Sequence, residues 1–123
     1  MISFTCFELE NGIPIYLQIL LYIKRGIVEG TIKDNDELPS RRVLSALLGV
    51  NPNTVQKSYR MLEEEGLIQS RCGTKSYMVL DEAKIEATRR QLIEEEARSL
   101  VDRFRSMGLE KEEVLGLVEK YWE

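Results

Sequence analysis

Apolar side chains recur every three or four residues in five stretches of the chain, the spacing of one buried helix face. The predicted helices cover residues 14–30, 40–49, 51–66, 81–107 and 110–121. Two short runs at 67–71 and 76–79 predict a β-hairpin, whose tip is Cys72-Gly73-Thr74-Lys75. Residues 1–12 lack helical spacing and 31–37 form a polar loop. The expected fold is therefore mainly α with a small hairpin.

The second and third helices follow each other closely. Ser40 is a preferred N-cap and Gly49 a preferred stop, while Asn51 and Pro52 suit the cap and first position of the next helix. That helix carries a buried stripe (Val55, Tyr59, Leu62) opposite a polar face (Asn53, Gln56, Lys57, Arg60). Helix, turn, recognition helix and hairpin wing together indicate a winged helix-turn-helix that reads DNA.

Two strings resemble a known family. NPNTVQKSYRMLEEEGLI at 51–68 is similar to the motif of the GntR family of bacterial winged helix-turn-helix regulators, in its small YtrA-type subfamily. PIYLQILLYIKRGIVEG at 14–30 resembles the first helix of the same domain. The resemblance implies a homodimeric repressor that binds an inverted-repeat operator, often that of a neighbouring transporter operon.

The predicted contacts with double-stranded DNA come from three elements. Arg41 and Arg42 lie at a helix N-terminus, where phosphates bind, and by resemblance Arg42 matches the arginine of the family's PSxR motif. Asparagine, glutamine and lysine suit base edges in the major groove. A merely solvated polar face is the alternative. The predicted DNA-binding residues are Arg41, Arg42, Asn51, Asn53, Thr54, Gln56, Lys57, Arg60, Arg71, Thr74 and Lys75.

The distribution of charge along the chain supports DNA binding by its middle part. The net charge of the chain is −4, but residues 38–79 contain six cations and three carboxylates. Residues 1–37 and 80–123 are both acidic. Because screening limits electrostatic reach to about 8 Å at physiological salt, the local sign matters most. Residues 80–123 are therefore not expected to contact DNA.

The last two predicted helices are too small to bury both of their apolar faces alone, so self-association is expected. Packing only against the winged domain is the alternative. We therefore divide the chain into a DNA-binding domain, 1–80, and a helical dimerisation tail, 81–123. The predicted dimerisation residues are Leu92, Ile93, Leu100, Phe104, Val114, Leu117 and Tyr121.

Other functions have little support in the composition. The chain has no histidine, only two cysteines, and neither a nucleophile motif nor a Gly-rich phosphate loop, so no enzyme, metal site or cofactor is expected. The alternative to purely structural thiols is a redox-sensing role for Cys72 at the wing tip, beside the DNA phosphates. No apolar run or signal sequence points to a membrane, which favours the cytoplasm. The sequence identifies no small-molecule effector. The main alternative function is a winged helix that binds protein without sequence-specific DNA binding.

Overall fold

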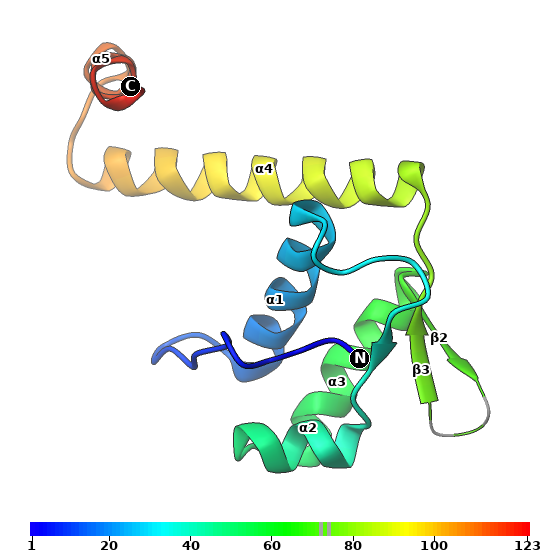
Figure 1. The fold of residues 1–123 in the computed structure, drawn as a ribbon. Helices are drawn as coiled ribbons and strands as arrows, with labels where there is room; N and C mark the ends of the chain where they lie inside the picture. Colours follow the sequence, from blue (N-terminus) through cyan, green and yellow to red (C-terminus); the bar gives the residue numbers. More distant parts are fainter. Residues whose placement is uncertain (72, 74) are drawn as a thin grey trace. The chain divides into compact units, whose positions relative to one another are not determined.

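The computed structural model describes residues 1–71, 73 and 75–123, and the elements in these ranges are five helices and one three-stranded sheet (Figure 1). In chain order they are α1 (Ile15–Glu29), β1 (Glu37–Leu38), α2 (Arg41–Leu48), α3 (Pro52–Glu64), β2 (Ile68–Arg71), β3 (Lys75–Met78), α4 (Glu82–Ser106) and α5 (Lys111–Tyr121). The five predicted helices and the hairpin are confirmed, with ends that differ by a few residues.

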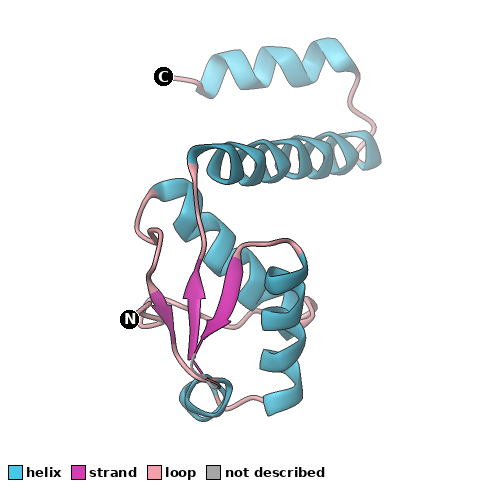
Figure 2. Ribbon diagram, turned by 90° about the vertical axis from the view of Figure 1, so that its right-hand side faces the viewer, coloured by secondary structure: helices cyan, strands magenta, loops and turns pink. Residues whose placement is uncertain are grey.

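The sheet has one strand more than the predicted hairpin. Its strands are antiparallel in the order β1-β3-β2, and Figure 2 shows them side by side. Glu37 lies opposite Tyr77, so the expectation that 31–37 is entirely loop was wrong at its last residue. Glu37 also accepts a hydrogen bond, through its carbonyl, from the amide of Ile2 at 2.8 Å. A two-residue strand is too short to show alternation, which is why the sequence pattern did not reveal it.

One hydrophobic core joins α1, α3 and the sheet. Its fully buried side chains include Ile19 and Ile23 from α1, Val55 and Leu62 from α3, and Met78 from β3. The predicted buried stripe of the third helix is therefore confirmed. This packing fixes the position of α3 and leaves its other side free to face solvent.

Capping residues fix the limits of the two helices in the helix-turn-helix. The Ser40 hydroxyl accepts a hydrogen bond from the amide of Val43 at 3.1 Å, which starts α2. Gly49 ends α2 with a φ of +68°, a conformation that glycine adopts without steric cost. The side chain of Asn51 caps α3, and Pro52 occupies its first turn. The predicted starts of both helices and the predicted stop of α2 are thus confirmed. α3 ends at Glu64 with Glu65 as its C-cap, and Gly66, the predicted stop, follows with a φ of +74°.

The N-terminal segment packs against α1 through three aromatic rings. The rings of Phe4 and Tyr22 stack with centroids 4.8 Å apart, and Phe7 meets Tyr22 edge-on at 5.3 Å. The Tyr22 hydroxyl donates to the carbonyl of Ser3 at 2.8 Å. These contacts hold the segment on the body, with a turn between the two phenylalanines in which the amide of Phe7 donates to the carbonyl of Phe4 at 3.1 Å.

The chain forms two compact units, Met1–Arg89 and Arg90–Glu123. The first contains α1, α2, α3 and the sheet, together with the start of α4. There the Lys84 ammonium donates to the carbonyl of Gly66 at 2.7 Å. The second unit contains the rest of α4 and α5. Its α5 begins with a capping box formed by Glu110 and Glu113. The division falls within α4, nine residues beyond the predicted domain boundary.

Candidate nucleic-acid interface

The two sides of α3 differ sharply in exposure. Asn53, Lys57 and Arg60 are exposed, and Gln56 is half-buried. The side chain of Ser58, on the opposite side, is fully buried. The structure thus places the predicted base-reading residues on the solvent side of α3, and the half-buried Thr54 lies in its first turn.

Carboxylates gather at the far end of this helix. Among the described residues of α3 and its C-cap, the acidic side chains are Glu63, Glu64 and Glu65. Glu64 lies 3.9 Å from Arg60, and Glu65 binds the buried ammonium of Lys24 at 2.8 Å. The N-terminal half of α3 therefore combines the positive end of the helix dipole with polar side chains and Lys57. This half suits an anionic ligand.

Asn51 contributes to this end of α3 mainly through its cap. Its side-chain oxygen accepts a hydrogen bond from the amide of Asn53 at 2.8 Å. That oxygen is engaged within the protein, while the side-chain NH₂ is a donor suited to an acceptor on DNA.

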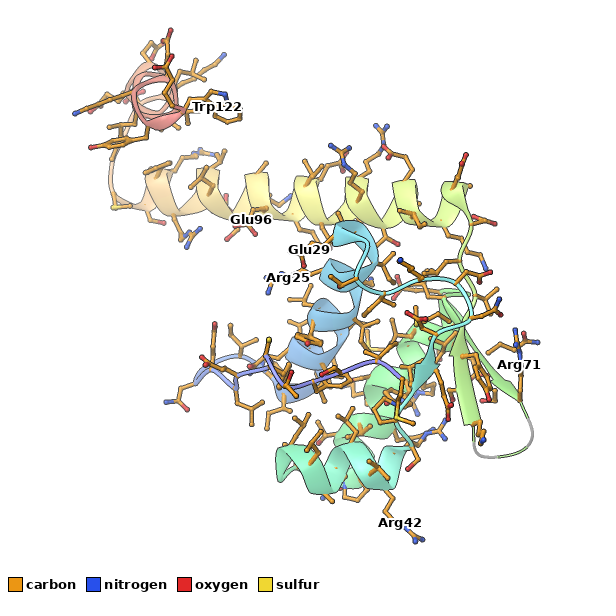
Figure 3. The ribbon with its side chains drawn as sticks, in the orientation of Figure 1. Arg25, Glu29, Arg42, Arg71, Glu96 and Trp122 are labelled. Carbon is orange, nitrogen blue, oxygen red and sulfur yellow. The ribbon has the colours of Figure 1, made fainter. Side chains whose placement is uncertain are left out.

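The two arginines at the start of α2 occupy different environments. Arg42 is exposed and points away from the helix, as Figure 3 shows. Arg41 is half-buried, and its guanidinium lies 5.7 Å from the centroid of the Tyr59 ring. The Nε of Arg41 is buried and has no hydrogen-bond partner in the part of the chain that the structure describes. Arg42 is therefore the more accessible of the two predicted phosphate contacts.

Tyr59 connects α3 to the start of α2. Its buried hydroxyl donates a hydrogen bond to the carbonyl of Pro39 at 2.6 Å, immediately before the α2 cap. Burial raises the pKa of Tyr59 well above its ordinary value of 10.0, although the Arg41 charge opposes this shift. The ring and hydroxyl thus fix the α2 N-terminus against the recognition helix.

The wing carries two more exposed cations. Arg71 and Lys75 face each other across the β2–β3 pair. Arg71 projects from the end of β2 (Figure 3), with its guanidinium 5.1 Å from the Tyr77 ring centroid. It also donates to the side-chain oxygen of Asn35 at 3.5 Å. The predicted contact Thr74, and Cys72, lie outside the described residues.

Sequence reasoning missed the aromatic partners of these cations. The ammonium of Lys57 lies 3.8 Å from the centroid of the Tyr16 ring. Tyr16 is half-buried and lies in the first turn of α1. The signal was weak because Tyr16 and Lys57 are far apart in the sequence and belong to different helices.

Comparison with known proteins identifies the family. Residues 15–79 match the family described as bacterial regulatory proteins, gntR family. The chain belongs to the GntR family. A GntR regulator has a helix-turn-helix DNA-binding domain, so the predicted fold and family are confirmed, and the chain is a transcriptional regulator rather than an enzyme.

Relatives extend the match beyond the GntR domain. The HTH-type transcriptional repressor YtrA of Bacillus subtilis (strain 168) is 35% identical over 107 residues, which cover 85% of this chain and 82% of that protein. The structure of a GntR family transcriptional regulator from Listeria monocytogenes has a TM-score of 0.77 and 34% identity, covering 91% of this chain and 98% of that one. The predicted YtrA-type resemblance is thereby confirmed.

A second similar structure contains DNA. It is the DNA-binding domain of AraR in complex with operator ORX1, with a TM-score of 0.51 and 26% identity. It covers 59% of this chain and 88% of that one.

The described residues contain neither a metal-binding cluster nor a membrane-spanning helix. No group of three or more histidine, cysteine, aspartate or glutamate side chains is placed to hold a metal ion within these residues. None of the helices in the described ranges is both long and apolar enough to cross a membrane.

Proposed function

We propose that this GntR regulator is a homodimeric repressor that binds an inverted-repeat operator in the cytoplasm. The observation that carries the proposal is the exposed polar face of α3, with the exposed cations of α2 and the wing in the same compact unit. The name of the similar B. subtilis protein, a transcriptional repressor, supports repression as the outcome.

The contacts divide by chemistry. Asn53 and Gln56 carry amides that pair with adenine edges, and Lys57 is a donor to guanine acceptors. Arg42, Arg71 and Lys75 carry positive charges suited to phosphates. Arg41 supports this surface from its half-buried position, and Asn51, Thr54 and Arg60 lie beside these residues at the cap and along α3.

In this proposal the helical tail forms the dimer interface. Within residues 90–123, Leu92, Phe104 and Val114 are half-buried, whereas Ile93, Leu100 and Tyr121 are exposed, as is Leu117. Exposed apolar side chains at helical spacing on α4 and α5 are the feature that a second copy would cover. We accordingly propose residues 1–80 as the DNA-binding domain and 81–123 as the dimerisation tail.

Two recognition helices related by a twofold axis would enter successive major grooves, about 34 Å apart. Each subunit brings five exposed cations to the proposed surface (Arg42, Lys57, Arg60, Arg71, Lys75). Because each neutralised phosphate releases counterions, affinity for DNA should fall steeply as salt rises.

A salt titration of Arg42→Ala tests the phosphate contacts. We expect this variant to weaken binding to all duplexes about equally and to make the slope of log K against log salt shallower by about two per dimer. Lys33→Ala, which removes an exposed cation outside the proposed interface, is the control and should leave the slope unchanged. An unchanged slope in Arg42→Ala would contradict the phosphate role.

The absence of any salt-dependent DNA binding by the wild-type chain would favour a protein-binding winged helix.

A further inference from the structure

Each element of the proposed DNA surface has a cation beside a tyrosine ring. The pairs are Arg41 with Tyr59, Lys57 with Tyr16 and Arg71 with Tyr77, and their charge-to-centroid distances are 5.7, 3.8 and 5.1 Å. All three fall within the range of cation–π attraction, and the pair on the recognition helix is the closest.

The Tyr16 ring is held in place relative to the recognition helix. The carbonyl of Tyr16 accepts a hydrogen bond from the hydroxyl of Ser58 at 2.7 Å. Ser58 is fully buried and follows Lys57 directly in α3. The backbone that carries the ring is therefore tied to the residue next to the lysine. Buried Ile19, one turn further along α1, anchors the same region in the core.

We propose that Tyr16 is a positioning residue for Lys57 in DNA recognition. This inference rests on the proposed function, because it requires Lys57 to contact DNA. The ring face engages one side of the ammonium and leaves the N–H donors on the other side for an acceptor on a base or phosphate. An immobilised lysine loses much rotamer entropy, and the ring removes part of that loss before DNA binds.

The position of Tyr16 makes the effect specific to one lysine. Tyr16 is the second residue of α1, outside the helix-turn-helix and the wing. Through Lys57, a residue of α1 would influence the affinity of α3 for DNA. A tyrosine that only packs would change stability, and any effect on affinity would not depend on Lys57.

A double-mutant cycle in the full chain separates these roles. The probe is a duplex bound by the wild-type protein, measured at one fixed salt concentration. Tyr16→Leu removes the aromatic face but keeps apolar bulk, and Tyr16→Phe retains the face as the matched control. Lys57→Met removes the ammonium and keeps an unbranched side chain. The double variant Tyr16→Leu, Lys57→Met completes the cycle.

We expect Tyr16→Leu to weaken binding about threefold or more and Tyr16→Phe to stay within about twofold of the wild type. In the Lys57→Met background, Tyr16→Leu should change affinity by less than about twofold. Replacement of Tyr16 by pentafluorophenylalanine, which keeps the ring shape and reverses its electrostatics, should weaken binding as Leu does. This variant preserves the test if Tyr16→Leu unfolds.

Other outcomes overturn the inference in different ways. Equal weakening by Tyr16→Leu in both backgrounds would show a packing role. Tighter binding by Tyr16→Leu would show that the ring competes with DNA for the ammonium. Full affinity in Lys57→Met would remove Lys57 from the interface while leaving the proposed function intact. A wild-type chain that binds no duplex would instead refute the proposed function itself.

Discussion

Asn51 illustrates how a residue proposed for DNA contact first serves the fold. Its side-chain oxygen caps α3 through the amide of Asn53 at 2.8 Å. The cap fixes the first turn of the recognition helix, where Asn53 is exposed. Any contact of Asn51 with DNA therefore uses the rest of its side chain and depends on the same local geometry.

We expect Asn51→Ala to lower the free energy of unfolding by about 1 kcal/mol, because the capping acceptor is lost. Asn51→Asp, which retains an acceptor oxygen at the same place, is the matched control and should keep most of that stability. Urea denaturation followed by circular dichroism measures both. Equal stability of the Ala variant and the wild type would show that the cap contributes little.

The hydrogen bond of the Tyr59 side chain can be tested in the same way. Tyr59→Phe keeps the buried ring but leaves the carbonyl of Pro39 without its donor. We expect a loss of about 1–2 kcal/mol in the free energy of unfolding at neutral pH, the cost of an unsatisfied buried acceptor. Because this carbonyl precedes the α2 cap, DNA affinity should fall as well.

The same residue makes stability depend on alkaline pH. The folded-state pKa of Tyr59 lies above its ordinary value of 10.0, so the folded protein holds this proton more tightly than the unfolded chain does. Its contribution is complete below pH 10 and is lost as pH rises through the folded-state pKa. Tyr59→Phe should therefore show a smaller loss of stability above pH 10 than the wild type. Parallel curves for the two proteins would exclude this role.

Among the helices and strands, capping residues and hydrophobic spacing in the sequence were enough to locate the helices but not every strand. Ser40, Gly49 and Asn51 act within a few residues of their own position, so their type alone predicted where α2 begins and ends and where α3 begins. β1 exists only because Glu37 pairs with Tyr77, forty residues later. Such pairing leaves no periodic trace in a two-residue segment.

The candidate site was predictable to a similar degree. The spacing of apolar residues placed Asn53, Lys57 and Arg60 together on the solvent side of α3, where the structure has them. It could not show that Lys57 rests on Tyr16, because that contact depends on how α1 crosses α3. Nor could it separate exposed Arg42 from half-buried Arg41, which are neighbours in the same helical turn.

The tail yields a prediction about assembly. Leu100 lies on α4 and is 37% exposed. A second copy of the chain would cover this exposed apolar surface. We expect Leu100→Asp to shift the protein from dimer to monomer, because a carboxylate buried in an apolar interface lacks a partner. Ser99→Asp introduces the same charge at the preceding, exposed position and should remain a dimer.

Sedimentation equilibrium measures this change, and the single tryptophan provides a second readout. Trp122 projects from the end of α5 (Figure 3) and is 80% exposed in the isolated chain. If the dimer covers this end of α5, its fluorescence should shift to shorter wavelengths as protein concentration rises. A Leu100→Asp protein that remains fully dimeric would contradict the proposed role of the tail.

For the whole molecule, the distribution of charge matters more than its sum. The net charge of −4 would oppose DNA binding if it were spread evenly. Instead, exposed cations occupy α2, α3 and the wing, while the segment from residue 80 onward is acidic. An acidic segment repels the DNA backbone and so favours contact through the winged domain alone.

Selection of bound duplexes from a random pool at physiological salt tests whether the protein is a dimer that recognises a specific DNA sequence. We expect enrichment of an inverted repeat whose half-site centres lie about one helical turn apart, or a whole number of turns. That result would establish a dimeric sequence reader and define its operator. Enrichment of a single unrepeated site would contradict the twofold arrangement. No enrichment above weak, salt-sensitive binding would contradict sequence-specific recognition itself.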